Sequence, residues 1–184
     1  MSQISYGSGD NFATEQGDIN IILESKNLFS NLSEIIGILG KRLVIDDEDA
    51  TALPPFSPKA KVTHNNLVKY RRIIELYRVY AGKLSVVYGE FDRAGKSTTQ
   101  YTLININTHY ERIKGEYVAA TPLNDELEVV RAHADEIFDK VQQTLLREVK
   151  SSYNLTEPLE TVNVCLTAIM VDAFMRCKIL ERPE

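Results

Sequence analysis

The chain has 184 residues, 43% hydrophobic and 26% charged, which are the proportions of one ordinary globular domain rather than of a disordered chain. Its formal net charge of -5 argues against a generic nucleic-acid binder, because neutralising phosphates needs a surplus of Lys and Arg. No apolar stretch is long enough to cross a bilayer, and the polar start has no signal-peptide pattern. We therefore expect a cytoplasmic protein that has no contact with a membrane.

The first 23 residues differ in pattern from the rest of the chain. A strand-like segment that ends at Tyr6 is followed by turn residues at 7–11, and residues 17–22 then alternate polar with apolar, with Ile19 and Ile21 on one side. This pattern predicts a short N-terminal β hairpin or arm over residues 1–23, with the helical domain in residues 24–184. Because unpaired strand edges accept another strand, we predict partner-binding residues here, namely Tyr6, Phe12, Ile19 and Ile21. A hairpin folded against its own domain, or a disordered start, are the alternatives.

A first helix is predicted over residues 25–41, where apolar side chains recur at three- and four-residue spacing and Gly40 is a plausible stop signal. The acidic run Asp46-Asp47-Glu48-Asp49 and the prolines up to Pro58 then predict an irregular surface loop. The run lacks the alternating oxygen ligands and the central glycine of a calcium-binding loop.

The clearest helical pattern covers residues 65–91. Apolar residues follow one another at alternating spacings of three and four, from Leu67 through Ile74 and Leu84 to Phe91. Ile73 and Leu76 widen this apolar face, which favours burial within a bundle over a thin contact between two chains.

Three further helices are predicted after this one. The first opens at Ser97 or Thr98 and ends near Lys114, and the second is capped by Asn124 and extends to about Val149. The last one covers residues 158–180 and is apolar on nearly every side, which is typical of a centrally buried helix. The fold class is therefore mainly α: a bundle of about five helices built around the last one, with the short N-terminal β hairpin or arm.

No set of residues indicates an enzyme, a cofactor or a metal site. The run Ala94-Gly95-Lys96-Ser97-Thr98 resembles the end of a phosphate-binding loop, but the glycine spacing is wrong and a helix precedes it instead of a strand. The three histidines fall in different segments without zinc-ligand spacing. Cys165 and Cys177 are twelve residues apart in one predicted helix, about 18 Å and too far for a disulfide.

Asp172 and Arg176 stand one turn apart in the most apolar predicted helix. Charges on a buried helix should be paired, because an unpaired charge in a core is costly. Two interpretations stay open: an internal ion pair that fixes packing, or a polar contact at the edge of a partner interface.

Several short segments together resemble a known family. They are HNNLVKY at 64–70, IIELY at 73–77, YAGKL at 80–84, EFD at 90–92 and VDAFMRCKI at 171–179, together with GDNF at 9–12 and GDIN at 17–20. These segments are similar to the C-terminal domains of ABC-three-component systems, which include or resemble Lamassu-type antiphage defence. In those bacterial systems an SMC-like ATPase acts with a small middle component and an effector.

The resemblance implies an adaptor or protein-binding module that docks to an SMC-like ATPase or an effector. The lack of a catalytic set of residues and the net negative charge predict that it is non-catalytic and has no direct contact with nucleic acid. The ATPase and nuclease motifs of such systems are absent from the sequence. The alternative function is a self-assembling structural or regulatory oligomer.

Overall fold

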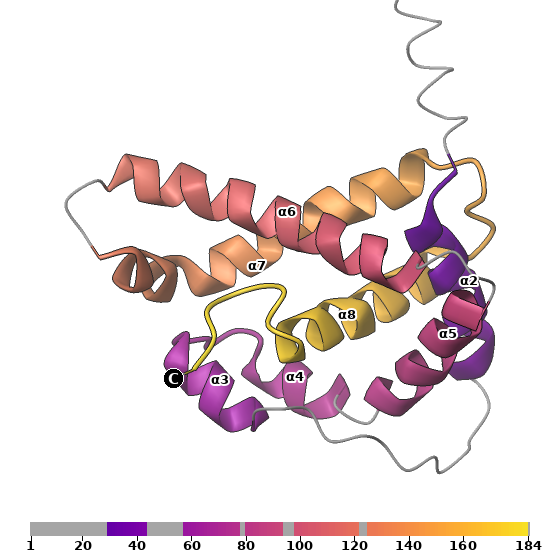
Figure 1. The fold of residues 1–184 in the computed structure, drawn as a ribbon, viewed down its shortest axis with the longest axis horizontal. Helices are drawn as coiled ribbons and strands as arrows, with labels where there is room; N and C mark the ends of the chain where they lie inside the picture. The colour runs from indigo at the N-terminus through magenta and orange to yellow at the C-terminus, as the bar shows by residue number, and fades with distance from the viewer. Residues whose placement is uncertain (1–28, 44–56, 78–79, 94–97, 122–124, 184) are drawn as a thin grey trace, which may run out of the picture.

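A computed structural model describes residues 29–43, 57–77, 80–93, 98–121 and 125–183 (Figure 1). This part of the chain is all-helical, without strands, and it contains seven helices rather than the five expected. They are α2 (Asn31–Leu43), α3 (Pro58–His64), α4 (Arg71–Tyr77), α5 (Ala81–Arg93), α6 (Thr98–Ala120), α7 (Glu126–Ser151) and α8 (Leu159–Met175). The predicted hairpin or arm at 1–23 and its boundary with the helical domain lie outside the described residues.

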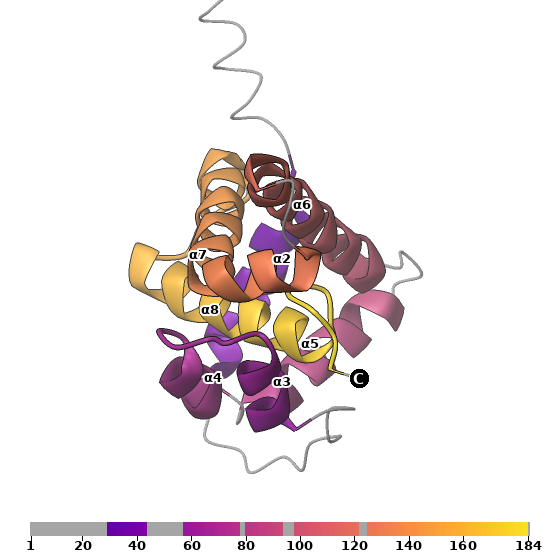
Figure 2. The same ribbon diagram turned by 90° about the vertical axis from the view of Figure 1, so that its left-hand side faces the viewer.

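The prediction that the last helix is central is confirmed. α8 contacts α2, α4, α5 and α7, and Leu166, Ile169 and Phe174 are completely buried. Figures 1 and 2 show α6 and α7 on one side of α8 and α3 and α4 on the other. The helix ends at Met175 rather than near residue 180, because the chain turns there.

The long helix predicted over residues 65–91 is wrong as one element. The structure has two helices here, α4 and α5, and a turn with Asn66 at φ 54° precedes them. The apolar pattern nevertheless identifies buried residues, since Leu67, Ile74, Leu84 and Phe91 all lie in the core. Both helices contact α8, so the pattern reflects one shared core rather than one straight helix.

A second difference concerns Pro58, which was assigned to a loop. It opens α3, where its missing N–H and fixed φ suit the first turn of a helix. α3 has only seven residues and too few apolar positions to show a helical period, so no periodic pattern predicts it.

Gly40 does not end the first helix, contrary to expectation. It is buried inside α2, and a Cβ atom at this position would lie 2.6 Å from Cγ2 of Thr161 on α8. The glycine therefore permits close packing of α2 against α8.

α6 and α7 form a long antiparallel pair (Figure 1). α6 continues through Gly115, where the sequence had suggested its end. The N-cap of α7 is Asp125, whose carboxylate accepts a hydrogen bond of 2.7 Å from the N–H of Leu127. His133 departs from helical geometry within α7 (φ -120°, ψ 15°). None of the described helices combines the length and the apolarity that a membrane span requires.

Candidate functional site

The chain turns back on itself after α8. The N–H of Lys178 donates to the carbonyl of Ala173 (2.8 Å), and the N–H of Cys177 donates to that of Phe174 (3.1 Å). This is the paired arrangement of a Schellman C-cap, and Cys177 (φ 55°) occupies the left-handed position that glycine usually takes. Cys177 therefore lies just beyond the end of α8, whereas the sequence predicted that it lies within the helix. Both cysteines are free thiols. The turn leads into residues 176–183, here called the C-terminal segment.

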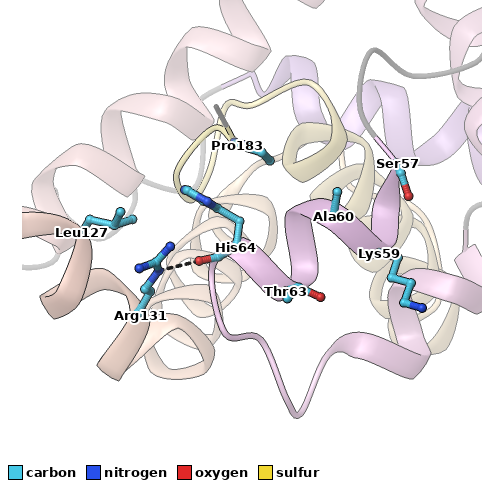
Figure 3. A pocket seen from close by; sticks show the side chains of 8 residues that line it. All are labelled: Ser57, Lys59, Ala60, Thr63, His64, Leu127, Arg131 and Pro183. Atoms are coloured by element: carbon cyan, nitrogen blue, oxygen red, sulfur yellow. Dashed lines mark hydrogen bonds between the residues drawn. The ribbon is translucent and has the colours of Figure 1, made fainter.

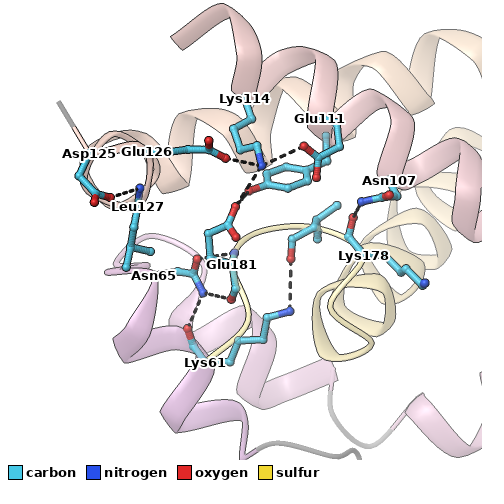
Figure 4. A network of polar contacts seen from close by, with 12 residues as sticks. Lys61, Asn65, Asn107, Glu111, Lys114, Asp125, Glu126, Leu127, Lys178 and Glu181 are labelled. Carbon is cyan, nitrogen blue, oxygen red and sulfur yellow. Dashed lines mark hydrogen bonds and ion pairs between the residues drawn. The ribbon is translucent and has the colours of Figure 1, made fainter. Parts of the chain in front are cut away.

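Two side chains near the end of α3 hold this segment (Figure 4). Lys61 is completely buried, and its Nζ donates to the carbonyls of Phe174 and, at 3.3 Å, Ile179. Asn65, also buried, pairs through its amide with the backbone of Glu181, donating to its carbonyl (2.8 Å) and accepting from its N–H (2.7 Å). The C-terminal segment is thus an integral part of the domain.

The Glu181 side chain links the same segment to α6. Its Oε1 accepts from the hydroxyl of Tyr110 (2.5 Å) and lies 3.3 Å from Nζ of Lys114. Lys114 also pairs with Glu111 (2.9 Å) and Glu126 (2.8 Å), so one ammonium joins α6, α7 and the C-terminal segment. Burial lowers the pKa of Lys114, but the three carboxylates outweigh it and the net shift is upward.

The predicted ion pair between Asp172 and Arg176 is present, with Nε of Arg176 2.8 Å from Oδ2 of Asp172. The carboxylate is buried, whereas the Arg176 side chain is 39% exposed, and its guanidinium lies 5.5 Å from the centre of the Tyr88 ring. Burial raises the pKa of Asp172, and the opposing effect of Arg176 does not cancel this rise. The ion pair thus joins residues at the end of α8, and the guanidinium contacts Tyr88 of α5. A partner contact through the exposed guanidinium stays a prediction.

The other four predicted partner-binding residues, Tyr6, Phe12, Ile19 and Ile21, lie outside the described residues. So do Asp46–Asp49 and residues 94–97, and the interpretation that Lys96 binds no nucleotide therefore stays a prediction.

A surface that sequence reasoning missed lies where residues 29–32 pack beside α6 and the end of α7. Its hollow of about 430 Å³ is lined by Phe29, Tyr101, Asn105 and Glu148, among others. Phe29 is 52% exposed and Tyr101 65%, and the ring of Phe29 lies 6.2 Å from that of Tyr153, which is 59% exposed. We call Phe29, Tyr101 and Tyr153 with this hollow the aromatic surface.

One signal in the sequence could have identified this surface. The buried residues of α6 include Leu103, Ile106, Tyr110 and Ile113, and Tyr101 and Ile104 fall off that stripe. Both are exposed in the structure. Large apolar side chains on the solvent side of an amphipathic helix are typical of a binding surface.

Two of the three histidines pair with carboxylates. Nε2 of His109 lies 2.7 Å from Glu148, and Nδ1 of His133 lies 3.4 Å from Glu136. In the part of the chain that the structure describes, no three His, Cys, Asp or Glu residues gather as metal ligands would.

Comparison with known families gives one match. Residues 30–181 match the family described as C-terminal domain 10 of the ABC-three component (ABC-3C) systems. No curated protein and no solved structure matches the chain. The matched residues begin just before α2 and end at Glu181, so they include the whole bundle and the C-terminal segment down to its contacts with Asn65 and Tyr110. The chain therefore belongs to the family of C-terminal domain 10 of the ABC-three component systems.

Proposed function

We propose that the chain is a non-catalytic protein-binding domain that docks to another component of an ABC-three-component antiphage system. Membership of the family supports this proposal, because such a system has further components with which a domain can assemble. The resemblance to these systems suggests an SMC-like ATPase or an effector as the partner.

The observation that carries the proposal is the aromatic surface. Tyrosine and phenylalanine are enriched at the centres of protein interfaces, where they bury a large area with little loss of side-chain entropy. Phe29 and Tyr101 line one hollow, the ring of Tyr153 lies beside that of Phe29, and Asn105 and Glu148 supply a polar rim. An apolar centre with a polar rim is the usual anatomy of a docking site.

The aromatic surface is also where residues 1–28 join the described fold. Phe29 is the first described residue, so the predicted binding residues of the arm, from Tyr6 to Ile21, precede this surface directly in sequence. We propose that the arm and the aromatic surface bind the same partner.

Replacing Tyr101 with alanine tests the aromatic surface. A central tyrosine at an interface contributes about 2 kcal/mol or more, so binding to the other components should weaken about 30-fold. The measurement is the dissociation constant of the purified chain with each component of its own system.

Leu76→Ala is the matched control, because Leu76 is 60% exposed on α4, away from this surface. It should bind like the unchanged chain. Equal binding by both variants would contradict the proposal. If Tyr101→Ala instead abolishes self-association of the chain in sedimentation experiments, without any effect on the other components, the oligomer is the correct function.

Deleting residues 1–23 tests the arm separately. The helical bundle should keep its circular dichroism and its melting temperature, because the proposal assigns the arm to a partner and not to the core. Binding to the partner, measured in the same way, should be lost. A truncated chain that binds normally, or one that unfolds, would show that the arm is not a binding element.

A further inference from the structure

We propose that a pocket beside α3 binds an acidic peptide segment of a protein partner. The pocket has a volume of about 700 Å³ and is lined by α3, α7 and the C-terminal segment (Figure 3). Its lining includes Lys59, Thr63, His64, Leu127, Arg131 and Pro183. The inference rests on the proposed function, since it names the chemistry of a segment that such a partner would supply.

The charge of the pocket is the first argument. Lys59 and Arg131 line it, and no Asp or Glu is among its lining residues, although the chain as a whole carries a net charge of -5. Among the described residues, neither cation has a carboxylate within ion-pair distance. A concentration of positive charge on an acidic protein attracts acidic ligands and orients them.

The second argument is that one of the cations is held in place. Nε of Arg131 donates to the carbonyl of His64 (2.7 Å), which fixes the arginine at the C-terminal end of α3 (Figure 3). Lys59 lies in the first turn of the same helix, so the two cations stand near opposite ends of α3 (Figure 3). An extended peptide with several carboxylates can therefore meet both cations along α3.

The walls favour a peptide over a nucleic acid or a free anion. Leu127, beside Arg131, and Pro183 supply apolar surface to the pocket (Figure 3), and Thr63 supplies a hydroxyl. A phosphate would use the cations alone, whereas a peptide also covers the apolar wall. Pro183 is placed by the contacts of Glu181 with Asn65, so the pocket depends on the same hydrogen bonds that fix the C-terminal segment.

A second, smaller hollow extends this surface along α3. It has a volume of about 220 Å³, shares Lys59 and Thr63 with the pocket, and adds Arg71, Ile74 and Glu75 from α4. The carboxylate of Glu75 offsets the charge of Arg71 there, so we expect the acidic part of the bound segment to end at Lys59.

The test uses the full chain and a fluorescently labelled hexaglutamate peptide, with binding followed by anisotropy. Hexaglutamate should bind more weakly as salt is raised, and Lys59→Glu should weaken binding at least tenfold. Lys41→Glu is the matched control, because Lys41 is an exposed lysine on α2 outside the pocket, and it should reduce binding less than twofold. Lys59 is itself exposed, so its variant should keep the melting temperature of the unchanged chain.

Three results would overturn the proposal: no binding of hexaglutamate, equal losses in Lys59→Glu and Lys41→Glu, or tighter binding of oligothymidylate or inorganic phosphate than of the peptide. Tyr101→Ala separates this proposal from the previous one. The Tyr101→Ala variant should bind hexaglutamate normally but no longer bind the other components. The experiment therefore distinguishes an error in the aromatic-surface proposal from an error in the pocket proposal.

Discussion

Replacing Ile169 with alanine should lower the free energy of unfolding by about 2–5 kcal/mol. Ile169 is completely buried in α8, the helix that contacts α2, α4, α5 and α7. Removing its side-chain carbons forfeits their burial and leaves a cavity that four neighbouring helices cannot all close at once. Urea denaturation followed by circular dichroism measures this change, with the slope of the transition expected to stay the same.

Leu159→Ala is the matched control for this prediction. It removes a similar amount of aliphatic side chain from the same helix, but Leu159 is 48% exposed, so its variant should lose less than about 1 kcal/mol. Equal losses in the two variants would show that α8 is not the centre of the core.

The buried Lys61 should make the protein more stable as pH rises above 8. Burial lowers the pKa of Lys61 from 10.5 to about 8. Between these values the unfolded chain keeps the proton that the folded chain has lost, so unfolding must take up a proton and becomes less favourable as pH increases. The free energy of unfolding should gain about 3 kcal/mol over this window, at about 1.4 kcal/mol for each pKa unit.

Lys61→Met isolates this contribution, since it keeps a long side chain that cannot titrate. Other buried groups act in the opposite direction: burial raises the pKa of the Cys165 thiol to about 11 and that of Tyr70 to about 12, which destabilises the folded state at high pH. The difference in unfolding free energy between the unchanged chain and the variant removes these effects and should grow from pH 8 to 10.5. A difference independent of pH would mean that Lys61 does not lose its proton in the folded protein.

The fold was predictable where a periodic pattern and burial coincide. α8 is apolar on nearly every side, and its central position follows directly from its sequence. The pattern over residues 65–91 identified the buried residues but not the division into α4 and α5, because two helices that pack on one core can carry a single continuous seam. Leu76 shows the limit of this reasoning, since it was assigned to the apolar face and is largely exposed.

The candidate sites were less predictable because they depend on contacts between distant segments. The ion pair of Asp172 and Arg176 was predictable, since four residues on one helix make one turn. Asn65 and Glu181 are 116 residues apart, and neither is unusual in its own segment. A lysine such as Lys61 suggests a solvated position until the fold surrounds it with carbonyls.

The hydrogen bonds between α3 and the C-terminal segment also set an order of events during synthesis. A seven-residue helix is too short to persist alone in water, and Lys61 finds its carbonyl partner 113 residues later in the chain. Because the N-terminal residues are synthesised first, α3 cannot form its stabilising contacts until almost the whole domain has left the ribosome. The α6–α7 pair, whose contacts are local, can form before it. The pocket beside α3 is therefore the last part of the domain to be completed, and a nascent chain cannot bind through it prematurely.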